Sequence, residues 1–369
     1  MKIWRRASGV LKDKNSIWVA KLSRRTAFRN RHLETAIIKA TSHDESFVDY
    51  KNSQRVFTWV RTSPAYFRPL IWILSTRMEK TRSWVVALKG LILMHGVFCC
   101  KIPAARMIKR LPFDLSNFND GHSKPVKTWG FSSFVRAYFA FLDHRCAFLS
   151  GDSSEEQEEN KESSSMVQVL VKLQQLQSLL DILLQIRPNA DGMIVVLILE
   201  AMDCVIIEIF DVYRRICNGV ARVLVGIYAA GKVEAAMALC VLKKAASQGE
   251  ELSSYFEFCR DIGVLNASEF PKIEQIPEDD IRDLERIIHG VSDKWNMGIF
   301  DTGSIDEQED SKTIITENWE VFDDQLQVNG EGGGNFSDVQ KGNHTDPFDD
   351  SVDVPPLEHE GFPNLIGFV

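Results

Sequence analysis

Hydrophobic residues recur at helical spacing along most of this chain. Between Met166 and Ile186 the apolar positions lie three or four residues apart, with Gln and Lys between them. The positions are Met166, Val169, Leu173, Leu176, Leu180 and Leu183. This spacing places them on one face of a long helix, and Pro188-Asn189 is a typical helix end.

Three later segments extend the helical pattern. Residues from Met193 to about Cys217 are apolar nearly all round, which predicts a central buried helix. Residues Lys232–Cys259 contain no Pro and are rich in Ala, Leu, Lys and Glu, a composition that favours helix. Pro277, the acids that follow it and Gly290 delimit a further helix.

The first half of the chain predicts shorter helices, and strand signals are weak throughout. The predicted helices lie near residues 33–42, 51–61, 65–79, 83–99, 103–110 and 131–148. No segment alternates with period two between hairpin turns. We therefore expect an all-α fold in which antiparallel helices pack pairwise in a solenoid-like stack.

Two segments interrupt the pattern. Residues 151–165 are polar and acidic, and residues 301–369 hold 2 basic against 17 acidic side chains, so both are expected to be disordered. The predicted organisation has five parts: a basic segment 1–22, an N-terminal lobe 23–150, a loop 151–165, a long-helix part 166–292 and a tail 293–369.

Charge divides the chain more sharply than its net value of −8 suggests. Residues 1–150 carry 27 Lys and Arg against 9 Asp and Glu, whereas residues 151–369 carry 16 against 42. A basic half of this kind is attracted to phosphates on lipid headgroups or nucleic acid, although it can also be a solvated face with no partner.

Cysteine and hydropathy point to a cytoplasmic protein that meets membranes only at their surface. The seven Cys are odd in number and fall mostly within apolar helical patterns, which predicts reduced, buried thiols. Residues 1–22 lack the apolar core of a secretory signal. The most apolar stretch, Met193–Phe210, contains three acidic residues, too many for a membrane span.

Catalytic and metal-binding patterns are missing from the sequence. We find no GxSxG, HExxH or GxxxxGK[ST], and no Cys/His cluster at zinc spacing. His95 lies in an apolar helical segment and is expected to be a hydrogen-bonded core residue rather than a ligand. We therefore expect no enzyme activity, no cofactor and no metal site.

Several blocks, in order, give the chain a resemblance to a known family. Five of them are ETAIIKATSH (34–43), SWVVALKGLILMH (83–95), LPFDLSNF (111–118), FVRAYFAFL (134–142) and FPKIEQIP (270–277). Together with the basic segment 5–21 and helical blocks at 207–218 and 250–263, they resemble the ANTH-domain clathrin-assembly proteins of the ENTH/VHS superfamily. The resemblance spans about residues 5–290 and implies a right-handed stack of helices.

The resemblance also implies a phosphatidylinositol 4,5-bisphosphate site in the N-terminal lobe. The residues expected to form it are Lys39, His43, Lys51 and Arg55. Lys39 matches the Lys of the family's K-A-T block, and Lys51 matches one basic position of its Lys-x-Lys/Arg-His loop. Asp49 stands where that loop has Lys, and Asn52 where it has His. Because cations must converge on the phosphates, this departure predicts weak or altered phosphoinositide binding.

Bulk charge near the N-terminus could compensate for the altered loop. The predicted membrane-contact residues are Lys2, Arg5, Arg6, Lys12, Lys14 and Lys21. Val10, Leu11, Ile17 and Trp18 could form a short apolar face against lipid. The alternative is that this segment packs on the domain as a terminal helix.

The tail contains two short motifs that resemble peptides captured by adaptor-complex appendage domains. One is a WxxF of Trp319 and Phe322, and the other is the DPF of Asp346, Pro347 and Phe348. An aromatic anchor among acids can bind without a folded partner surface. The apolar segment 362–368 could be a further docking peptide or a flap on the domain. Binding to the clathrin heavy chain, and to R-SNAREs through residues 190–260, is implied by the resemblance alone.

Three classes of function remain after these observations. The leading one is a peripheral adaptor that promotes clathrin coat assembly at coated pits and vesicles, in endocytosis or Golgi-derived budding. The second is a helical cargo or SNARE scaffold whose lipid site has degenerated. The third, a nucleic-acid binder, rests only on the basic half and lacks any recognised reading motif, so we expect no nucleic-acid partner.

Overall fold

The computed structural model describes residues 2–22, 30–121, 125–155, 165–227 and 230–268, together with 281, 282, 285 and 286. All of them belong to one compact unit, residues 1–300. Within these described residues the regular elements are all helical, which confirms the predicted all-α class. The tail motifs and most of the helix predicted between Pro277 and Gly290 lie outside this part of the chain.

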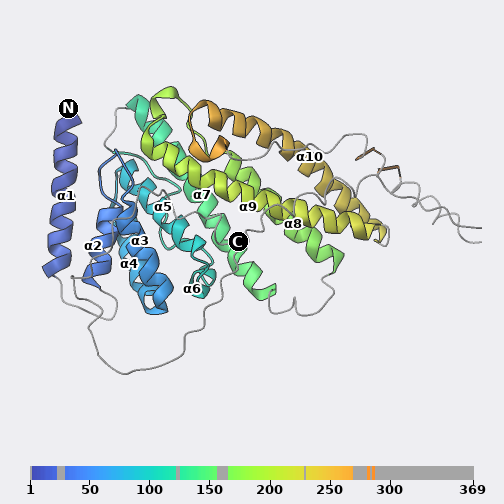
Figure 1. Ribbon diagram of the computed structural model, residues 1–369, viewed down its shortest axis with the longest axis horizontal. Coiled ribbons are helices and arrows are strands. Elements are labelled where there is room, and N and C mark those ends of the chain that lie inside the picture. Colours follow the sequence, from blue (N-terminus) through green and yellow to red (C-terminus); the bar gives the residue numbers. More distant parts are fainter. Residues whose placement is uncertain are drawn as a thin grey trace, which may run out of the picture. The chain divides into compact units, whose positions relative to one another are not determined.

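The first six α-helices are mostly short and form the N-terminal part of the stack (Figure 1). Their bounds are α1 Lys2–Leu22, α2 Arg31–Ala40, α3 Tyr50–Thr62, α4 Phe67–Lys80, α5 Trp84–Cys99 and α6 Pro103–Arg106, with a 3₁₀ turn η1 at Pro64–Tyr66. Helix α1 packs beside α2, and α2 packs against α3, α4 and α5. The predicted helix at 103–110 is shorter than expected, since α6 ends at Arg106.

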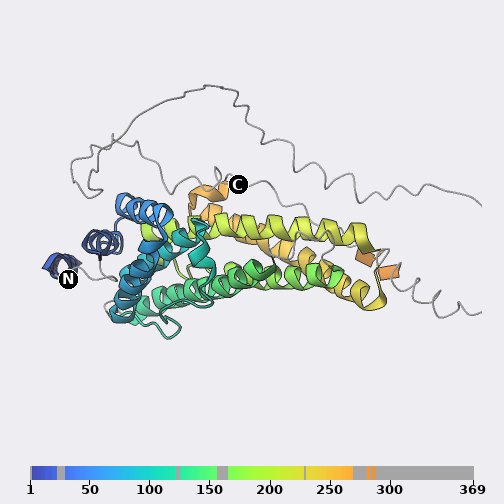
Figure 2. The ribbon, with the colours of Figure 1, turned by 90° about the horizontal axis from the view of Figure 1, so that it is seen from below.

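Longer helices build the rest of the stack. They are α7 Pro125–Glu155, α8 Met166–Leu184, α9 Val196–Gly226 and α10 Lys232–Asp261, with 3₁₀ turns η2 Asp191–Met193 and η4 Leu265–Ser268. Helices α8, α9 and α10 pack on one another as an extended bundle, which is clearest in Figure 2. The backbone of α7 remains helical through Glu155, beyond Gly151 where a loop was predicted to begin.

The most completely buried helix is α5. Every residue from Trp84 to Phe98 is buried, including two polar side chains, Lys89 and His95. The segment from Met193 to Cys217, predicted as a central buried helix, falls largely in α9, whose inward positions are buried while others are half-buried or, as at Val196 and Arg214, exposed. All seven Cys are free thiols, as predicted, but the predicted burial holds for only three of them. Cys146, Cys204 and Cys259 are buried, three others are half-buried and Cys240 is exposed.

Candidate functional site

Two lysines flank the segment that joins α2 to α3. Lys39 lies one residue before the end of α2, and Lys51 lies in the first turn of α3. Both side chains are exposed, and among the described residues neither ammonium group has an ion-pair or hydrogen-bond partner. Unpaired exposed cations keep their charge available for an external anion.

The other two residues of the expected lipid site are already engaged. The imidazole Nδ1 of His43 lies 2.8 Å from Oδ1 of Asp13 in α1. Arg55 is exposed one turn after Lys51, and its guanidinium lies 5.3 Å from the ring centroid of Trp59. The structure thus leaves Lys39 and Lys51 open, stacks Arg55 on an aromatic ring and ties His43 to the N-terminal helix.

The two positions that depart from the family loop have a structural role. Asp49 is the N-cap of α3, and its Oδ1 accepts the backbone N–H of Asn52 at 3.0 Å. The side-chain amide of Asn52 donates to Oδ2 of the same carboxylate at 2.7 Å. Since Asn52 is buried, it is turned toward the domain rather than toward a ligand.

A buried lysine of α5 forms hydrogen bonds to the segment that joins α2 to α3. The ammonium group of Lys89, only 1% exposed, donates to the carbonyl oxygen of Asp44 at 2.6 Å and to Oγ of Ser42 at 3.2 Å. It also lies 5.4 Å from the ring centroid of Phe47. Burial lowers the pKa of Lys89 to about 8, so the charge is costly here and its partners are needed. Lys89 is therefore a support for the site rather than part of its surface.

Helix α1 exposes part of the predicted membrane-contact set. Lys12, Lys14 and Lys21 are exposed; Lys2, Arg5 and Arg6 belong to the helix, but their side chains lie outside the described part. Of the predicted apolar face, Val10, Leu11 and Trp18 are exposed, whereas Ile17 is half-buried. The sequence offered two alternatives for this segment, lipid contact or packing on the domain, and the helix both packs on α2 and presents apolar side chains outward.

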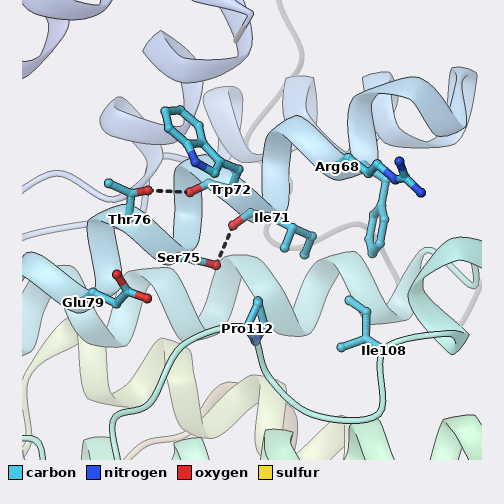
Figure 3. Close-up of a pocket in the computed structure, with 9 residues that line it drawn as sticks. Arg68, Ile71, Trp72, Ser75, Thr76, Glu79, Ile108 and Pro112 are labelled. Carbon is cyan, nitrogen blue, oxygen red and sulfur yellow. Dashed lines mark hydrogen bonds between the residues drawn. The ribbon is translucent and has the colours of Figure 1, made fainter. Parts of the chain in front are cut away.

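A groove of about 550 Å³ between α4 and the segment that follows α6 is a second candidate surface (Figure 3). It is lined by Phe67, Arg68, Ile71, Trp72, Ser75, Thr76, Glu79, Ile108 and Pro112. The hydroxyls of Ser75 and Thr76 donate to carbonyl oxygens of their own helix. With those donors already used, the groove offers mostly apolar surface and few polar groups that could orient a small ligand.

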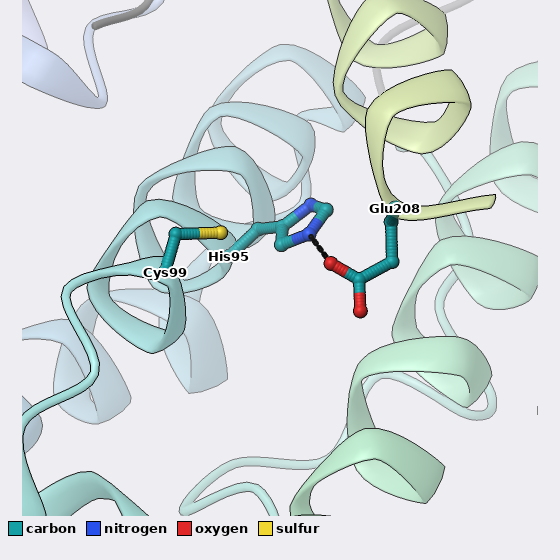
Figure 4. Close-up of side chains that lie close together, drawn as sticks. All are labelled: His95, Cys99 and Glu208. Atoms are coloured by element: carbon teal, nitrogen blue, oxygen red, sulfur yellow. Dashed lines mark hydrogen bonds and ion pairs between the residues drawn. The ribbon is translucent and has the colours of Figure 1, made fainter. Parts of the chain in front are cut away.

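The core contains one cluster that could suggest a metal site. The ligand atoms of His95, Cys99 and Glu208 lie within 4.8 Å of one another (Figure 4). The imidazole of His95 is however fully used, by the hydroxyl of Tyr138 at 2.8 Å and by Oε2 of Glu208 at 3.2 Å. Arg145 donates to the other oxygen of Glu208. The prediction of a hydrogen-bonded core histidine is therefore confirmed.

Comparison with known proteins agrees with this architecture. The family model described as the ANTH domain matches residues 32–290. The chain belongs to the ANTH-domain family. Two relatives from Arabidopsis thaliana, each called "Putative clathrin assembly protein", are 53% and 48% identical to it, over 88% of this chain and 88% of their own length. A third of the same description from that plant is 43% identical over 78% of this chain and 82% of its own.

Two residues near the candidate site, Asp13 and Arg77, were not predicted from the sequence of this ANTH-domain protein. His43 and Arg77 both bind the carboxylate of Asp13, although they lie 30 and 64 positions further along the chain. No local pattern signals a contact over such distances.

Among the described residues, no helix is both long enough and apolar enough to cross a bilayer.

Proposed function

We propose that this ANTH-domain protein is a peripheral membrane adaptor that binds phosphoinositides and promotes clathrin coat assembly, rather than an enzyme. The observation that supports it most directly is the pair of exposed, unpaired lysines, Lys39 and Lys51, on either side of the segment joining α2 and α3. They lie in the basic half of the chain, whose field favours approach to an anionic surface. The names of the relatives support the clathrin part of the proposal.

Several finer parts of this proposal follow from the resemblance. The lipid surface is formed by Lys39, His43, Lys51 and Arg55, with the basic face of α1 beside them. The five-part organisation predicted from the sequence places the adaptor motifs in the tail, behind the folded domain. The protein acts at clathrin-coated pits and vesicles on the cytoplasmic side of the plasma membrane or the Golgi, with the clathrin heavy chain as a partner and R-SNAREs bound by the long helices.

Liposome sedimentation of the full chain tests the lipid part. One set of vesicles carries phosphatidylinositol 4,5-bisphosphate, and the other carries phosphatidylserine at the same total charge. Each basic residue near an anionic surface contributes about 1 kcal/mol, so Lys39→Glu or Lys51→Glu should weaken binding to the first set by about 2 kcal/mol, roughly 30-fold.

The matched control is Lys232→Glu, the same charge change at an exposed lysine that begins α10. It should change binding far less than the two site variants. Equal loss in all three variants would mean that net charge alone attracts the protein. No binding of the wild type to either vesicle set would contradict the lipid-adaptor function.

A second function, a cargo or SNARE scaffold with a degenerate lipid site, is favoured by Asp49. Its carboxylate stands where the family loop has a cation, and it is held in place by Asn52. A scaffold of this kind would bind R-SNARE helices but would not distinguish the two vesicle sets. The sedimentation experiment therefore separates the two functions.

The tail motifs are tested with an isolated appendage domain of an adaptor complex. Full-length chain should bind it in a calorimetric titration, because an aromatic anchor flanked by acids fits a basic-rimmed pocket. Trp319→Ala combined with Phe348→Ala should abolish binding. If the double variant binds as the wild type does, these motifs are not the docking peptides.

A further inference from the structure

Helix α1 approaches the domain closely through one narrow face. Gly9, Asp13 and Ala20 lie four and seven residues apart, which places them on the same side of the helix. Gly9 and Ala20 are buried, and they are the only residues of α1 that are buried among residues 8–22. A Cβ on Gly9 would lie 2.7 Å from Cβ of His43, so the close approach requires glycine. Among residues 8–22, apolar burial therefore contributes little to the attachment of α1.

One carboxylate of α1 accepts several hydrogen bonds from the domain. Oδ2 of Asp13 accepts the backbone N–H of His43 at 2.8 Å, while Oδ1 lies 2.8 Å from the ring Nδ1 of His43 and 2.9 Å from Nη2 of Arg77. Arg77 is itself fixed by Thr41, since it donates to the hydroxyl at 2.6 Å and to the carbonyl oxygen at 2.7 Å. Three donors from two elements thus converge on a single anion.

The surroundings keep this anion charged. The side chains of Asp13, His43 and Arg77 are only 14%, 20% and 13% exposed. Burial alone would raise the pKa of Asp13, but the hydrogen bonds and charge of His43, followed by Arg77, lower the pKa below its ordinary value. We call these donors, the N–H and imidazole of His43 and the guanidinium of Arg77, the anion cradle.

The opposite face of α1 is apolar and unpacked. Leu11, Trp18 and Leu22 are 66%, 62% and 61% exposed, and their spacing of seven and four residues aligns them in one stripe. An exposed stripe of this kind gains free energy in an apolar environment such as the boundary of a lipid bilayer. Helix α1 therefore packs on the domain through the narrow face of Gly9, Asp13 and Ala20, and its opposite face exposes apolar side chains that could contact lipid.

We propose that the anion cradle is a phosphate-binding site whose internal occupant is Asp13, so that a phosphate group entering it releases α1. A phosphate monoester carries more negative charge than a carboxylate and offers three acceptor oxygens to the same donors. The inference rests on the proposed function for one source of that phosphate, a phosphoinositide headgroup at the membrane. A free phosphate in solution offers the same chemistry.

Competition for one site has a reciprocal consequence. Docked α1 and bound phosphate exclude each other, so whatever weakens docking strengthens phosphate binding by the same factor. Asp13→Asn removes the charge of the occupant. Gly9→Ala pushes α1 away by a contact with Cβ and ring carbons of His43, and it leaves the three donors of the cradle in place. Both changes should raise the affinity by independent routes, each by the factor by which it weakens docking.

The experiment uses the full chain and three probes: inorganic phosphate, soluble inositol 1,4,5-trisphosphate, and vesicles with phosphatidylinositol 4,5-bisphosphate. Affinity comes from calorimetry or sedimentation, and release of α1 from hydrogen exchange of its backbone amides. Because Asp13→Asn weakens the charged hydrogen bonds that dock α1, it should bind the trisphosphate about tenfold more tightly than the wild type. The α1 amides of the wild type should exchange faster when ligand is bound.

The matched control is Glu45→Gln, which removes the same charge from an exposed acid in the segment joining α2 and α3. It should leave the affinity and the exchange of α1 nearly unchanged. If phosphate alone speeds exchange in α1, a free phosphate suffices; if only the trisphosphate or the vesicles do, the headgroup is the source. Either result supports the cradle.

Two results would overturn the inference: unchanged affinity in both Asp13→Asn and Gly9→Ala, or unchanged exchange of α1 with every probe. These failures differ from failure of the proposed function. If vesicle binding depends on Lys39 but not on Asp13, only the cradle is excluded. If wild-type protein ignores the phosphoinositide vesicles but inorganic phosphate releases α1, the cradle stands and the lipid function falls.

Discussion

The side-chain amide of Asn52 donates a 2.7 Å hydrogen bond to the carboxylate of Asp49. These are the two positions at which the chain departs from the basic loop of its family. The bond shows that the departure is a compensated pair rather than two independent losses, because the acid caps α3 and the amide fixes the acid. Any effect of Asp49 on lipid binding must therefore be separated from its effect on the helix.

Substitutions at Asp49 can separate its effect on lipid binding from its effect on the stability of α3. Asn caps helices about as well as Asp, so Asp49→Asn keeps the cap and loses only the acceptor for the Asn52 side chain. It should therefore lower the unfolding free energy by less than Asp49→Ala, which should lower it by about 1 kcal/mol. Removal of one negative charge near the membrane should strengthen binding to phosphoinositide vesicles about fivefold in both variants. Urea denaturation and liposome sedimentation measure the two effects. Unchanged lipid affinity in Asp49→Asn would mean that Asp49 does not repel the headgroup.

Helix positions were largely predictable from the sequence, because apolar spacing and end signals are local. The helix predicted from Met166 begins there, where Ser165 and Gln168 form a capping box. The helix predicted from residue 131 instead begins at Pro125. Gly130 lies inside it, where a Cβ would come within 2.5 Å of Sδ of Met193, so this glycine permits close packing with η2.

The candidate site was predictable only in part. Lys39 could be matched from its block, and its exposure agrees with a surface role. The engagement of Asp13 by His43 and Arg77 depends on how α1 and α4 meet the end of α2. Such a meeting of distant segments is a property of tertiary packing, which hydrophobic spacing within one helix does not encode.

The buried carboxylate of Glu208 is expected to be essential for stability. Arg145 and His95 both pair with it, and Glu208→Gln would leave Arg145 as a buried charge without its counter-ion. Breaking a buried pair from one side costs about 3–5 kcal/mol, a loss that urea denaturation should measure. Tyr138→Phe, which removes only the 2.8 Å hydrogen bond to His95, is the matched control and should cost much less.

The same cluster should make stability depend on pH at both extremes. Burial opposes its charges, but Arg145 and His95 lower the pKa of Glu208 from 4.5 to about 2, and Cys99 and Glu208 raise the pKa of His95 from 6.5 to about 9. The stabilisation by Glu208 is thus lost as pH falls below 4.5 toward 2, and that by His95 is lost as pH rises from 6.5 through 9. Glu208→Gln should flatten both limbs; unchanged limbs would exclude the cluster as their cause.

Glu200 should act in a separate range of pH. It accepts a hydrogen bond from the hydroxyl of Tyr50, and burial, with a smaller contribution from Asp203, raises its pKa from 4.5 to about 6. A raised carboxyl pKa stabilises the fold below 4.5, and that stabilisation is lost as pH rises through 6. The protein should therefore lose up to about 2 kcal/mol of stability from this group between pH 4.5 and 7.

Thermal unfolding followed at intervals across that range measures this effect. Glu200→Gln should remove the slope, because the amide does not titrate and can still accept from Tyr50. Glu250→Gln, at an exposed position of α10, should retain it. A slope that survives in Glu200→Gln would assign the titration to another group.

Two glycines of the buried helix α5 offer a final test of how tightly the lobe is packed. A Cβ on Gly96 would lie 2.3 Å from Cζ of Phe57, a rigid ring that is itself 2% exposed. A Cβ on Gly90 would lie 2.3 Å from Sδ of Met78, near the end of a flexible side chain, and in ordinary contact with Leu74. Both Gly→Ala changes gain about 1 kcal/mol of helix propensity. The ring cannot yield, so overpacking should make Gly96→Ala less stable by about 1–2 kcal/mol net. Met78 can change rotamer, so Gly90→Ala should remain close to the wild type. Equal losses in urea denaturation would mean that the helix backbone, and not the flexibility of the facing side chain, decides the outcome.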